Sequence, residues 1–577
     1  MNLNLKNHYQ DLLFLPLGGA NEIGMNLNLY HLNGKWLMID CGVGFAYDAP
    51  GITMMTPDIS FLQQIKKNIL GLVLTHIHED HLGAVPYLWQ SLELPIYASN
   101  FAANFLRAKL EETTFAKKVP IHIIGNSLHL EPFTLDFVGL THSVPEMQAI
   151  IIKTSVGNVL HTGDWKLDPD PVIGKTSDLN KIASYSDNIL AMVCDSTNAI
   201  SAGHSRSEGE LYDSLKALIA GRFGLVGVTT FASNIARIHT IAKIASELGR
   251  KVVLAGFSLH RLYEVGKKSG YNFENCHFIS EREVKLYNKN EILVICTGCQ
   301  GEQMAATRKI ATNTHPVLHF SKGDLMIFSS KIIPGNEKKI FELFDLLAKK
   351  QIDVMTEKDH FVHVSGHPSQ EELKIMYQVA KPKIAIPVHG EFIHTKTHCE
   401  LALDCGVDKA IQPENGLVIK IDGQNPANSG AIGKVKSGYL GIDGKQLIDL
   451  DSIIIKERKK LQDSGIIFVS LGLNDKLIRS KQSKIMCIGC YDLKSDKIAQ
   501  ELIYKEIDVL LKGKAKELKL DQGGFSFTFL KKKKQPNLDK ISNELEKSIR
   551  SKIGKIFSDL TGKKPAIEVA IIINKHD

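Results

Sequence analysis

The sequence of 577 residues lacks several features that would define a protein class. No apolar run approaches the roughly 18–20 residues that a membrane-spanning helix needs. The first residues, MNLNLKNHYQ, carry neither the basic run nor the small-residue cleavage site of a secretion signal. Cysteine is scarce, and an odd count of nine does not suit a disulfide framework. These absences predict a protein of the reducing cytoplasm with no membrane segment.

What is present is typical of a globular protein. Hydrophobic residues make up 44% of the chain and charged residues 23%, which excludes wholesale disorder. At about 150 residues per domain, the length predicts three or four domains.

The positive charge is concentrated near the C-terminus. Residues 451–577 contain 27 basic and 17 acidic side chains, whereas the preceding 450 residues contain 43 and 46. Lys531–Lys534 are four consecutive lysines. The basic excess is either a solvated surface or an attraction for a polyanion such as nucleic acid.

Short apolar runs that end in polar turns predict buried strands. Helical patterns lie between many of them, at 81–92 and 209–219, which favours an α/β architecture. A His, Asp or Ser cluster follows each run, where loops at strand ends usually carry chemistry. The runs are 36–39, 71–74, 189–193, 292–295, 325–328 and 384–388.

Two later stretches bear on the domain organisation. Residues 422–430, DGQNPANSG, are rich in turn formers and predict a loop or a domain edge. Beyond about residue 450 the chain becomes lysine-rich, with a strand pattern at 484–487 and a helical one at 542–560. We expect a small α+β domain there.

The strongest chemical signal is the heptapeptide Thr75–His81, THIHEDH, directly after the run 71–74. Three imidazoles and two carboxylates at one strand-to-helix turn can surround a metal ion without long-range folding. Mixed nitrogen and oxygen ligands suit Zn²⁺ or another first-row divalent ion. The motif therefore predicts a metal site.

Further candidate ligands stand at later strand ends. His142, in THS, and Asp164, in TGDW, would each more often be structural residues if they stood alone. Asp40, after the run 36–39, is placed to orient a ligand histidine through a hydrogen bond. We interpret His161 as a core or edge histidine.

The order of the cluster 76–81, His142 and Asp164 resembles the metal-ligand motif of the metallo-β-lactamase fold. That fold is an αββα sandwich with two metal ions at one edge. The resemblance implies one ion on His76, His78 and His142. It implies a second on Asp80, His81 and a later histidine, with Asp164 bridging the two. Such a pair activates water for in-line displacement at phosphorus.

The second half of the chain resembles the β-CASP nucleases within that fold. Cys194–Asn198, CDSTN, is similar to their acidic motif A, and His363–His367, HVSGH, to their motif B. Pro387–Glu391, PVHGE, is similar to motif C, where His389 would complete the second metal. With a histidine in motif C the chain resembles the RNA-processing members of this group, so the resemblance implies RNA rather than DNA as the substrate.

Motifs along nearly the whole chain resemble the ribonuclease J group of these enzymes. Two departures lie in the inserted domain: GFS at 256–258 lacks an expected arginine, and Gln303 replaces an expected proline. Because both departures lie in the insert, they bear on how the protein would contact RNA. They do not bear on the metal chemistry. The motifs are LGGANEIG at 17–24, FASN at 231–234, TGCQGE at 297–302, IPGNE at 333–337 and LTGKKP at 560–565.

The resemblance implies a fold and a function together. We expect an α/β protein with the lactamase core in 1–205 and 363–450, the β-CASP insert in 206–362 and an oligomerisation domain in 451–577. We expect a ribonuclease with two Zn²⁺ per subunit, for which Mn²⁺ or Mg²⁺ can substitute. It would cut single-stranded RNA in 5′–3′ exonuclease and endonuclease modes in RNA maturation and mRNA decay. A homodimer or homotetramer, and contacts with other RNA-decay enzymes or the ribosome, are expected.

Roles for individual residues follow from the same resemblance. His367 would be the general acid, with Asp80 and Asp195 as the acidic members of the catalytic set. A pocket for an RNA 5′-monophosphate would be formed by Ser233, Asn234, His363, Val364, Ser365, Gly366 and His367. Asp443, in GIDG, matches a position that holds an accessory divalent cation in some relatives.

Other readings of the motifs remain. Cys296-x-x-Cys299 and Cys487-x-x-Cys490 have the spacing of a four-thiolate zinc site, but a long separation and the turn motif around the first pair disfavour it. We interpret His360, His394 and His398 as ordinary polar residues. The alternative functions are a hydrolase of a small thiolester or other metabolite, and a non-catalytic subunit of an RNA-decay complex.

Overall fold

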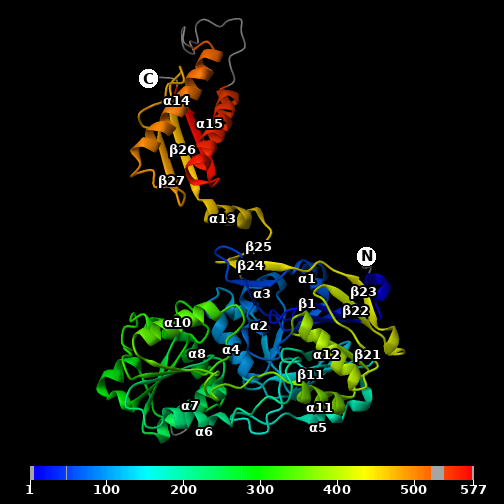
Figure 1. The fold of residues 1–577 in the computed structure, drawn as a ribbon. Helices are drawn as coiled ribbons and strands as arrows, with labels where there is room; N and C mark the ends of the chain where they lie inside the picture. Colours follow the sequence, from blue (N-terminus) through cyan, green and yellow to red (C-terminus); the bar gives the residue numbers. More distant parts are fainter. Residues whose placement is uncertain (1–4, 47, 274–275, 521–537, 575–577) are drawn as a thin grey trace. The chain divides into compact units, whose positions relative to one another are not determined.

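The computed structural model describes residues 5–46, 48–273, 276–520 and 538–574, so the lysine run 531–534 lies outside the described part. Contacts divide the chain into two compact units (Figure 1). One comprises Met1–Phe45 and Met54–Leu447, and the other comprises Ala46–Thr53 and Ile448–Asp577. The domain boundaries expected at 205, 362 and 450 remain predictions.

Two mixed sheets form the centre of the first unit. The first has the strand order β23-β22-β1-β2-β3-β6-β7-β8, and the second has the order β21-β20-β13-β12-β11-β10-β9. The first sheet consists of β1 (Leu12–Gly18), β2 (Leu27–Leu32), β3 (Lys35–Ile39), β6 (Ile69–Val73), β7 (Ile96–Ala98), β8 (Ile121–Ile123), β22 (Leu417–Ile421) and β23 (Gly430–Lys434). The second consists of β9 (Ser127–Leu130), β10 (Phe133–Gly139), β11 (Gln148–Lys153), β12 (Asn158–His161), β13 (Ile189–Asp195), β20 (Ile384–Val388) and β21 (Lys409–Ala410).

The two sheets pack face to face. Buried side chains from both, such as Phe14 and Tyr30 from the first and Phe133 and Ile150 from the second, form one apolar cluster between them. Every residue of β1 and β13 is buried, because each strand has an apolar layer on both faces.

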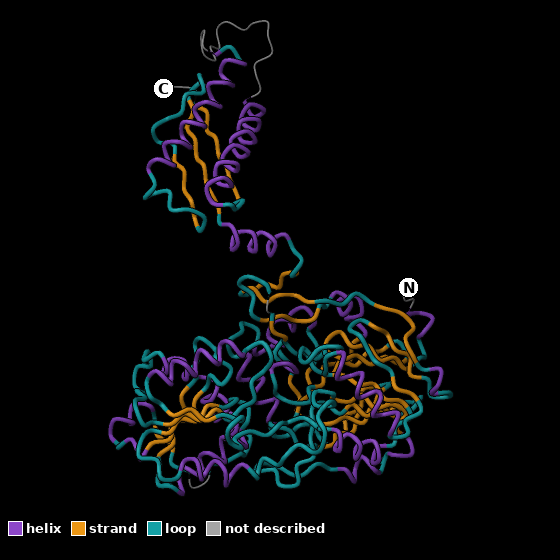
Figure 2. The backbone as a smooth tube through the Cα atoms, in the orientation of Figure 1, coloured by secondary structure: helices purple, strands orange, loops and turns teal. Residues whose placement is uncertain are grey.

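Helices cover the two outer faces. Leu88 of α3 and Phe101 of α4 pack with Leu72 of the first sheet, and Leu373 of α11 packs with Met192 of the second. The expected αββα sandwich is confirmed (Figure 2). The helices are α1 (Ser60–Ile65), α3 (Val85–Leu92), α4 (Asn100–Leu110), α5 (Leu179–Ala183), α11 (Gln370–Ala380) and α12 (Phe392–Asp404).

A third sheet belongs to the segment between β13 and α11. All its paired strands are parallel, in the order β16-β15-β17-β14-β18-β19, and amphipathic helices pack against it. Because the strands are parallel, the loops that follow them lie along one edge. The elements are α6 (Leu211–Ile219), β14 (Val226–Thr229), α7 (Ile235–Glu247), β15 (Lys251–Ala255), α8 (Phe257–Lys268), β16 (Phe278–Ile279), β17 (Ile292–Cys296), α9 (Ala306–Ala311), β18 (Leu325–Phe328), α10 (Glu337–Lys349) and β19 (Asp353–Met355).

A small sheet, β25-β24-β5-β4, combines strands from residues 44–57 with strands from residues 439–449. Its members are β4 (Gly44–Phe45), β5 (Met54–Pro57), β24 (Tyr439–Asp443) and β25 (Gln446–Asp449).

The second unit is an α+β fold of its own. Helices α14 and α15 cover one face of the sheet β27-β26-β28, and the alternating residues Ile467, Val469 and Leu471 of β26 are buried beneath them. Its elements are α13 (Ile453–Ser464), β26 (Ile466–Leu473), β27 (Lys484–Ile488), α14 (Lys497–Glu517), α15 (Leu538–Thr561) and β28 (Ala566–Ile573).

The six apolar runs that predicted strands correspond to β3, β6, β13, β17, β18 and β20. The helix predicted at 81–92 is instead two helices, α2 (Glu79–Leu82) and α3. The break follows from Pro86 in the first turn of α3, where a helix starts readily, and from the Ala84 N–H, which donates to the carbonyl of Cys41.

The turn-rich stretch 422–430 connects β22 to β23 within one sheet, so it is a loop and not a domain edge. Among the helices that the structure describes, none combines the length and the apolar character needed to cross a membrane.

Candidate metal centre

The candidate ligands meet because several strands of the two central sheets end at the same place. His76, His78, Asp80 and His81 follow β6 and enter α2. The others come after strands of the second sheet: His142 after β10, Asp164 after β12 and His389 after β20. Strand ends far apart in sequence therefore place their side chains around one point.

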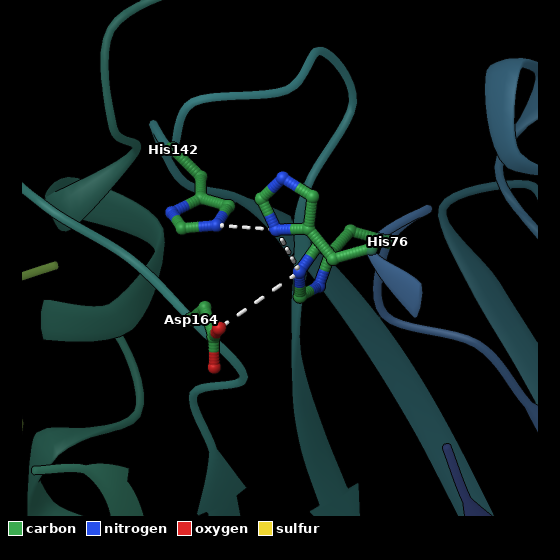
Figure 3. Close-up of side chains that lie close together, drawn as sticks. His76, His142 and Asp164 are labelled. Atoms are coloured by element: carbon green, nitrogen blue, oxygen red, sulfur yellow. Dashed lines mark hydrogen bonds and ion pairs between the residues drawn. The ribbon is translucent and has the colours of Figure 1, made fainter. Parts of the chain in front are cut away.

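A first group consists of His76, His78, His142 and Asp164 (Figure 3). His78 Nδ1 lies 3.1 Å from both His76 Nε2 and His142 Nε2. Asp164 Oδ2 lies 3.9 Å from His76 Nε2. Four ligand atoms arranged tetrahedrally around one Zn²⁺ stand about 3.3 Å apart. The spacing within this group suits a single ion.

A second group consists of Asp80, His81, Asp164 and His389. His389 Nε2 lies 3.0 Å from Asp80 Oδ2, and His81 Nε2 lies 3.1 Å from Asp164 Oδ2. Because Asp164 belongs to both groups, its carboxylate lies between them.

A third group combines Asp164 and His389 with Asp195 and His367. His367 Nδ1 lies 2.8 Å from Asp195 Oδ2, and the other Asp195 oxygen accepts from the backbone N–H and hydroxyl of Thr197. Asp195 is thus held by Thr197 and in turn orients the His367 ring.

The electrostatics of the first group favour neutral imidazole. Burial lowers the pKa of His78 to about 4, and it lowers the pKa of His76 and His142 well below the ordinary value. Neutral imidazole is the form that binds metal ions. These three nitrogens are therefore ready to act as ligands at neutral pH.

The second group concentrates negative charge. Burial opposes the protonated form of His389, but Asp164 and the hydrogen bond to Asp80 raise the pKa of His389 to about 9. Burial likewise opposes charge on His81, and Asp164, Asp80 and Asp40 raise its pKa well above the ordinary value. The negative charge of these carboxylates thus stabilises positive charge in this group.

Both groups fit divalent ions. The first offers three imidazole nitrogens that converge on one point, with His78 Nδ1 at 3.1 Å from the other two. The second offers the buried carboxylate of Asp164 and the partly exposed one of Asp80, whose charge a cation would balance. The nitrogen and oxygen donors match those of Zn²⁺ sites.

Neighbouring residues fix these side chains. Asp40 Oδ2 lies 2.7 Å from His81 Nδ1, which is the orienting contact expected from the sequence. The same carboxylate accepts from the backbone N–H and hydroxyl of Thr75. Asn26, which the sequence did not single out, contacts His81 Nε2 at 3.0 Å. His161 is a buried neighbour that pairs with the Tyr30 hydroxyl.

Motif B lies directly beside the first group. The Gly366 carbonyl is 2.6 Å from His142 Nδ1, and Ser365 Oγ accepts from the side-chain amide of Asn198 at 2.8 Å. Upstream, Val364 is buried, and burial lowers the pKa of His363 to about 3. The segment 363–367 therefore joins the metal centre to the inserted sheet.

The insert contributes Ser233 and Asn234 from the loop between β14 and α7. Ser233 is half-buried. Asn234 is the N-cap of α7, and its side-chain oxygen accepts the backbone N–H of Arg237 at 2.9 Å. Because that oxygen accepts this hydrogen bond, Asn234 caps α7 in addition to any contact with substrate.

Asp443 ends β24 and belongs to none of the metal-capable groups found among the described residues. Those groups also contain no cysteine. Cys296 and Cys299 lie in the first compact unit and Cys487 and Cys490 in the second.

Several supporting residues were not predicted from the sequence. Thr197 and Asn198 belong to the CDSTN motif, so the motif carried a signal for them. His398, interpreted as an ordinary polar residue, is fully buried between Ser196 Oγ and the Tyr377 hydroxyl, at 2.9 Å from each. A lone histidine in a helix gave no sign of this.

Comparison with known proteins agrees with this arrangement. Three family models match the chain: "Metallo-beta-lactamase superfamily" over residues 26–204, "Ribonuclease J, beta-CASP domain" over 224–347 and "Zn-dependent metallo-hydrolase RNA specificity domain" over 351–411. A solved structure of a protein of unknown function from Enterococcus faecalis V583 shares the fold, with a TM-score of 0.51 and 17% identity over 71% of this chain and 100% of that one.

Curated relatives match over most of the chain. Ribonuclease J of Sinorhizobium meliloti is 37% identical, with 97% of each chain covered. Ribonuclease J of Helicobacter pylori J99 is 32% identical over 90% of this chain and 75% of its own, and ribonuclease J2 of Bacillus subtilis is 33% identical over 84% and 87%. The chain belongs to the ribonuclease J family, within the metallo-β-lactamase and β-CASP group of hydrolases.

Proposed function

We propose that this protein is a metal-dependent ribonuclease that hydrolyses single-stranded RNA as a 5′–3′ exonuclease and an endonuclease, with a preference for 5′-monophosphate ends. One observation carries the proposal: the two metal-capable groups share Asp164, and the His367–Asp195 pair lies next to them, where the inserted domain joins the core. The family membership points to the same chemistry and to roles in RNA maturation and mRNA decay.

The residues of the two groups divide between two ions. His76, His78 and His142 would hold the first, and Asp80, His81 and His389 the second, with Asp164 shared. Zn²⁺ is the preferred ion, and Mn²⁺ or Mg²⁺ are substitutes. When bound, such a pair supplies an activated water and neutralises charge on the phosphate.

His367 is proposed as the general acid. Burial opposes its protonation, but Asp195 opposite Nδ1 and the nearby Asp164 raise the pKa of His367 above the ordinary value. Its Nδ1–H donates to Asp195, which leaves the Nε2 proton for the departing 3′ oxygen of the RNA. Asp195 then acts by orienting His367, and Asp80 acts as a ligand of the second ion.

The 5′-monophosphate is proposed to bind where motif B meets the insert. The Ser365 hydroxyl and the Gly366 backbone suit an anion, because a small residue lets the backbone approach it closely. Ser233 and Asn234 are proposed to bind the phosphate from the side of the inserted domain. His363, Val364 and His367 complete the proposed pocket.

We further propose self-association into a homodimer or homotetramer through residues 451–577. The sheet face opposite α14 and α15 exposes apolar side chains, a common sign of an interaction surface. Lys484 lies on one edge strand of this face and Glu568 on the other, which a twofold-related copy can complement. The exposed side chains are Phe468, Met486, Ile488 and Ile572.

Three lesser proposals complete the assignment. A cytoplasmic location fits the nine cysteines, all of which are unpaired. Asp443 is proposed for an accessory divalent cation. Other RNA-decay enzymes or the ribosome are proposed as partners.

The test is a digestion of RNAs that share one sequence and one internal label but differ at the 5′ end. The purified protein with Zn²⁺ should release mononucleotides fastest from the 5′-monophosphate form, more slowly from the 5′-triphosphate form, and not at all after chelation. Equal rates on both ends would remove the pocket. Hydrolysis of thiolesters without RNA cleavage would favour the alternative metabolite hydrolase.

A further inference from the structure

Arg237 is a fully buried arginine in the first turn of α7, within the inserted domain. Its guanidinium donates to both carboxylate oxygens of Glu208, with 2.9 Å between Nη2 and Oε2. Nη1 donates to Ser329 Oγ at 2.6 Å, to the Ser329 carbonyl at 3.0 Å and to the Val362 carbonyl at 3.2 Å. No role in the proposed chemistry uses this side chain.

These partners come from both places where the chain crosses between the core and the insert. Glu208 lies on the first crossing, just before α6, and Val362 lies on the second, just before motif B. Ser329 follows β18 and donates its own hydroxyl to the Val362 carbonyl at 2.7 Å. One guanidinium therefore ties the two crossings to each other and to the end of the inserted sheet.

The first crossing is in turn fixed to the core near the metal centre. The Glu208 N–H donates to Asp168 Oδ2 at 2.9 Å, and Ser207 Oγ donates to Asp168 Oδ1 at 2.5 Å. Asp168 forms a buried ion pair with Lys166 at 2.9 Å. Lys166 lies two residues after Asp164 in the chain. The ties of Arg237 thus continue into the loop that carries Asp164.

Arg237 also contacts the insert half of the proposed 5′-phosphate pocket directly, and it contacts the residue that precedes the core half. Its backbone N–H donates to Asn234, in the insert half, and its side chain donates to Val362, which directly precedes the HVSGH segment. The far end of that segment is held by the core, because Asn198 donates to both Ser365 Oγ and the His367 carbonyl.

We propose that Arg237 is a positioning residue that sets the spacing between the insert half of the pocket, Ser233 and Asn234, and its core half, Ser365 and Gly366. The inference rests on the proposed function, because it takes the 5′-phosphate site as given. The fork of a guanidinium satisfies Glu208 on one side and two carbonyls and a hydroxyl on the other. A lysine ammonium, with three donors on one atom, cannot hold both sides at these separations.

Arg250 offers a matched control within the same insert. It is also buried, and it donates to the carbonyls of Gly224 at 3.1 Å and Ile292 at 2.8 Å and to that of Arg222. These carbonyls precede β14 and begin β17, at the edge of the sheet opposite the pocket loops. Arg250→Lys removes the same group from the same sheet without touching either crossing.

The experiment compares kcat/KM on 5′-monophosphate and 5′-hydroxyl RNAs of one sequence for wild type, Arg237→Lys, Ser329→Ala and Arg250→Lys, each loaded with Zn²⁺. We expect the monophosphate-to-hydroxyl ratio to fall at least about tenfold in Arg237→Lys. Ser329→Ala loses two hydrogen bonds, one from Arg237 Nη1 and one to the Val362 carbonyl, and should lower the ratio about fivefold while remaining folded. Arg250→Lys should keep the wild-type ratio.

The possible outcomes separate the inference from the proposed function. If wild type does not distinguish the two RNAs, the pocket itself is wrong. If wild type distinguishes them and both Arg237→Lys and Ser329→Ala keep its ratio, with the two rates changing in parallel, Arg237 is only structural and the inference is wrong. A fall in the ratio for Arg250→Lys equal to that for Arg237→Lys would also overturn it, because general loosening of the insert would then explain both.

Discussion

At the scale of single residues, His367 and the metal-capable histidines occupy one site but are expected to do separable work. His367 is held through Asp195, whereas His142 Nε2 points at His78 in the first group. Removing His367 should therefore affect proton transfer, and removing His142 should affect metal binding.

His367→Ala should lower RNA cleavage by about 1,000-fold, because the leaving oxygen loses its proton donor. The zinc content, measured by mass spectrometry of the metal, should remain that of wild type. His142→Ala is the comparison, and it should lose both zinc and cleavage. Loss of zinc in His367→Ala would contradict the assignment of His367 as an acid and make it a ligand.

His398 predicts how stability depends on pH. Burial lowers its pKa from an ordinary 6.5 to about 4. Between these values the unfolded chain binds a proton at His398 that the folded chain does not, so stability falls as the pH decreases through this window. The loss from this residue should reach about 2 kcal/mol at pH 5.

The measurement is urea unfolding of metal-free wild type and His398→Gln at pH 7 and pH 5. Glutamine does not titrate, so the variant should lose less stability between the two pH values than wild type does. The same loss in both proteins would show that His398 is not the titrating group.

At the scale of elements, the metal loop is shaped by a close approach between residues 41–43 and α2. The Cys41 N–H donates to the His81 carbonyl at 2.6 Å, and the Val43 N–H donates to the Glu79 carbonyl at 3.0 Å. A Cβ on Gly42 would lie 1.7 Å from the Asp80 carbonyl oxygen. Only glycine fits between these backbones without displacing α2.

Gly42→Ala should therefore push α2 away and disturb Asp80 and His81 while leaving His76 and His142 in place. We expect a loss of about one zinc ion per chain and of RNA cleavage. Gly139→Ala is the control, since a Cβ there meets no atom within 4 Å. Full zinc content in Gly42→Ala would show that the loop adapts.

The strands and the first metal-binding loop could be predicted from the sequence because their signals are local. A buried run such as 189–193 is bounded by turns, and the THIHEDH motif brings its own ligands together within one turn. The two-helix form of 79–92 was missed in part because Pro86, a local signal for a helix start, was not used. The break also depends on a hydrogen bond from Ala84 to Cys41, a residue more than forty positions away.

At the scale of the whole molecule, the open sheet face of the second unit predicts how copies associate. Ile488 is 56% exposed at the end of β27 on this face, whereas Ile498 is 82% exposed at the start of α14. Ile488→Lys should place a charge in the interface and convert the oligomer to a monomer. Light scattering after gel filtration would measure this.

Ile498→Lys is the matched control, and it should keep the wild-type mass. Zinc content and cleavage of short RNAs should be unchanged in both variants, because the metal centre is contained in the other unit. A wild-type mass for Ile488→Lys would show that copies associate through another surface.

The sequence by itself determined the buried strands, the metal-binding motif and the family, because each depends on residue types at short, fixed spacings. The convergence of His142, Asp164 and His389 on that motif was decided by the tertiary structure, since only the pairing of strands brings these separate ends together. The same is true of Arg237: a buried and an exposed arginine look alike in a sequence. Whether its five donors meet water or two chain crossings is set by packing between distant segments.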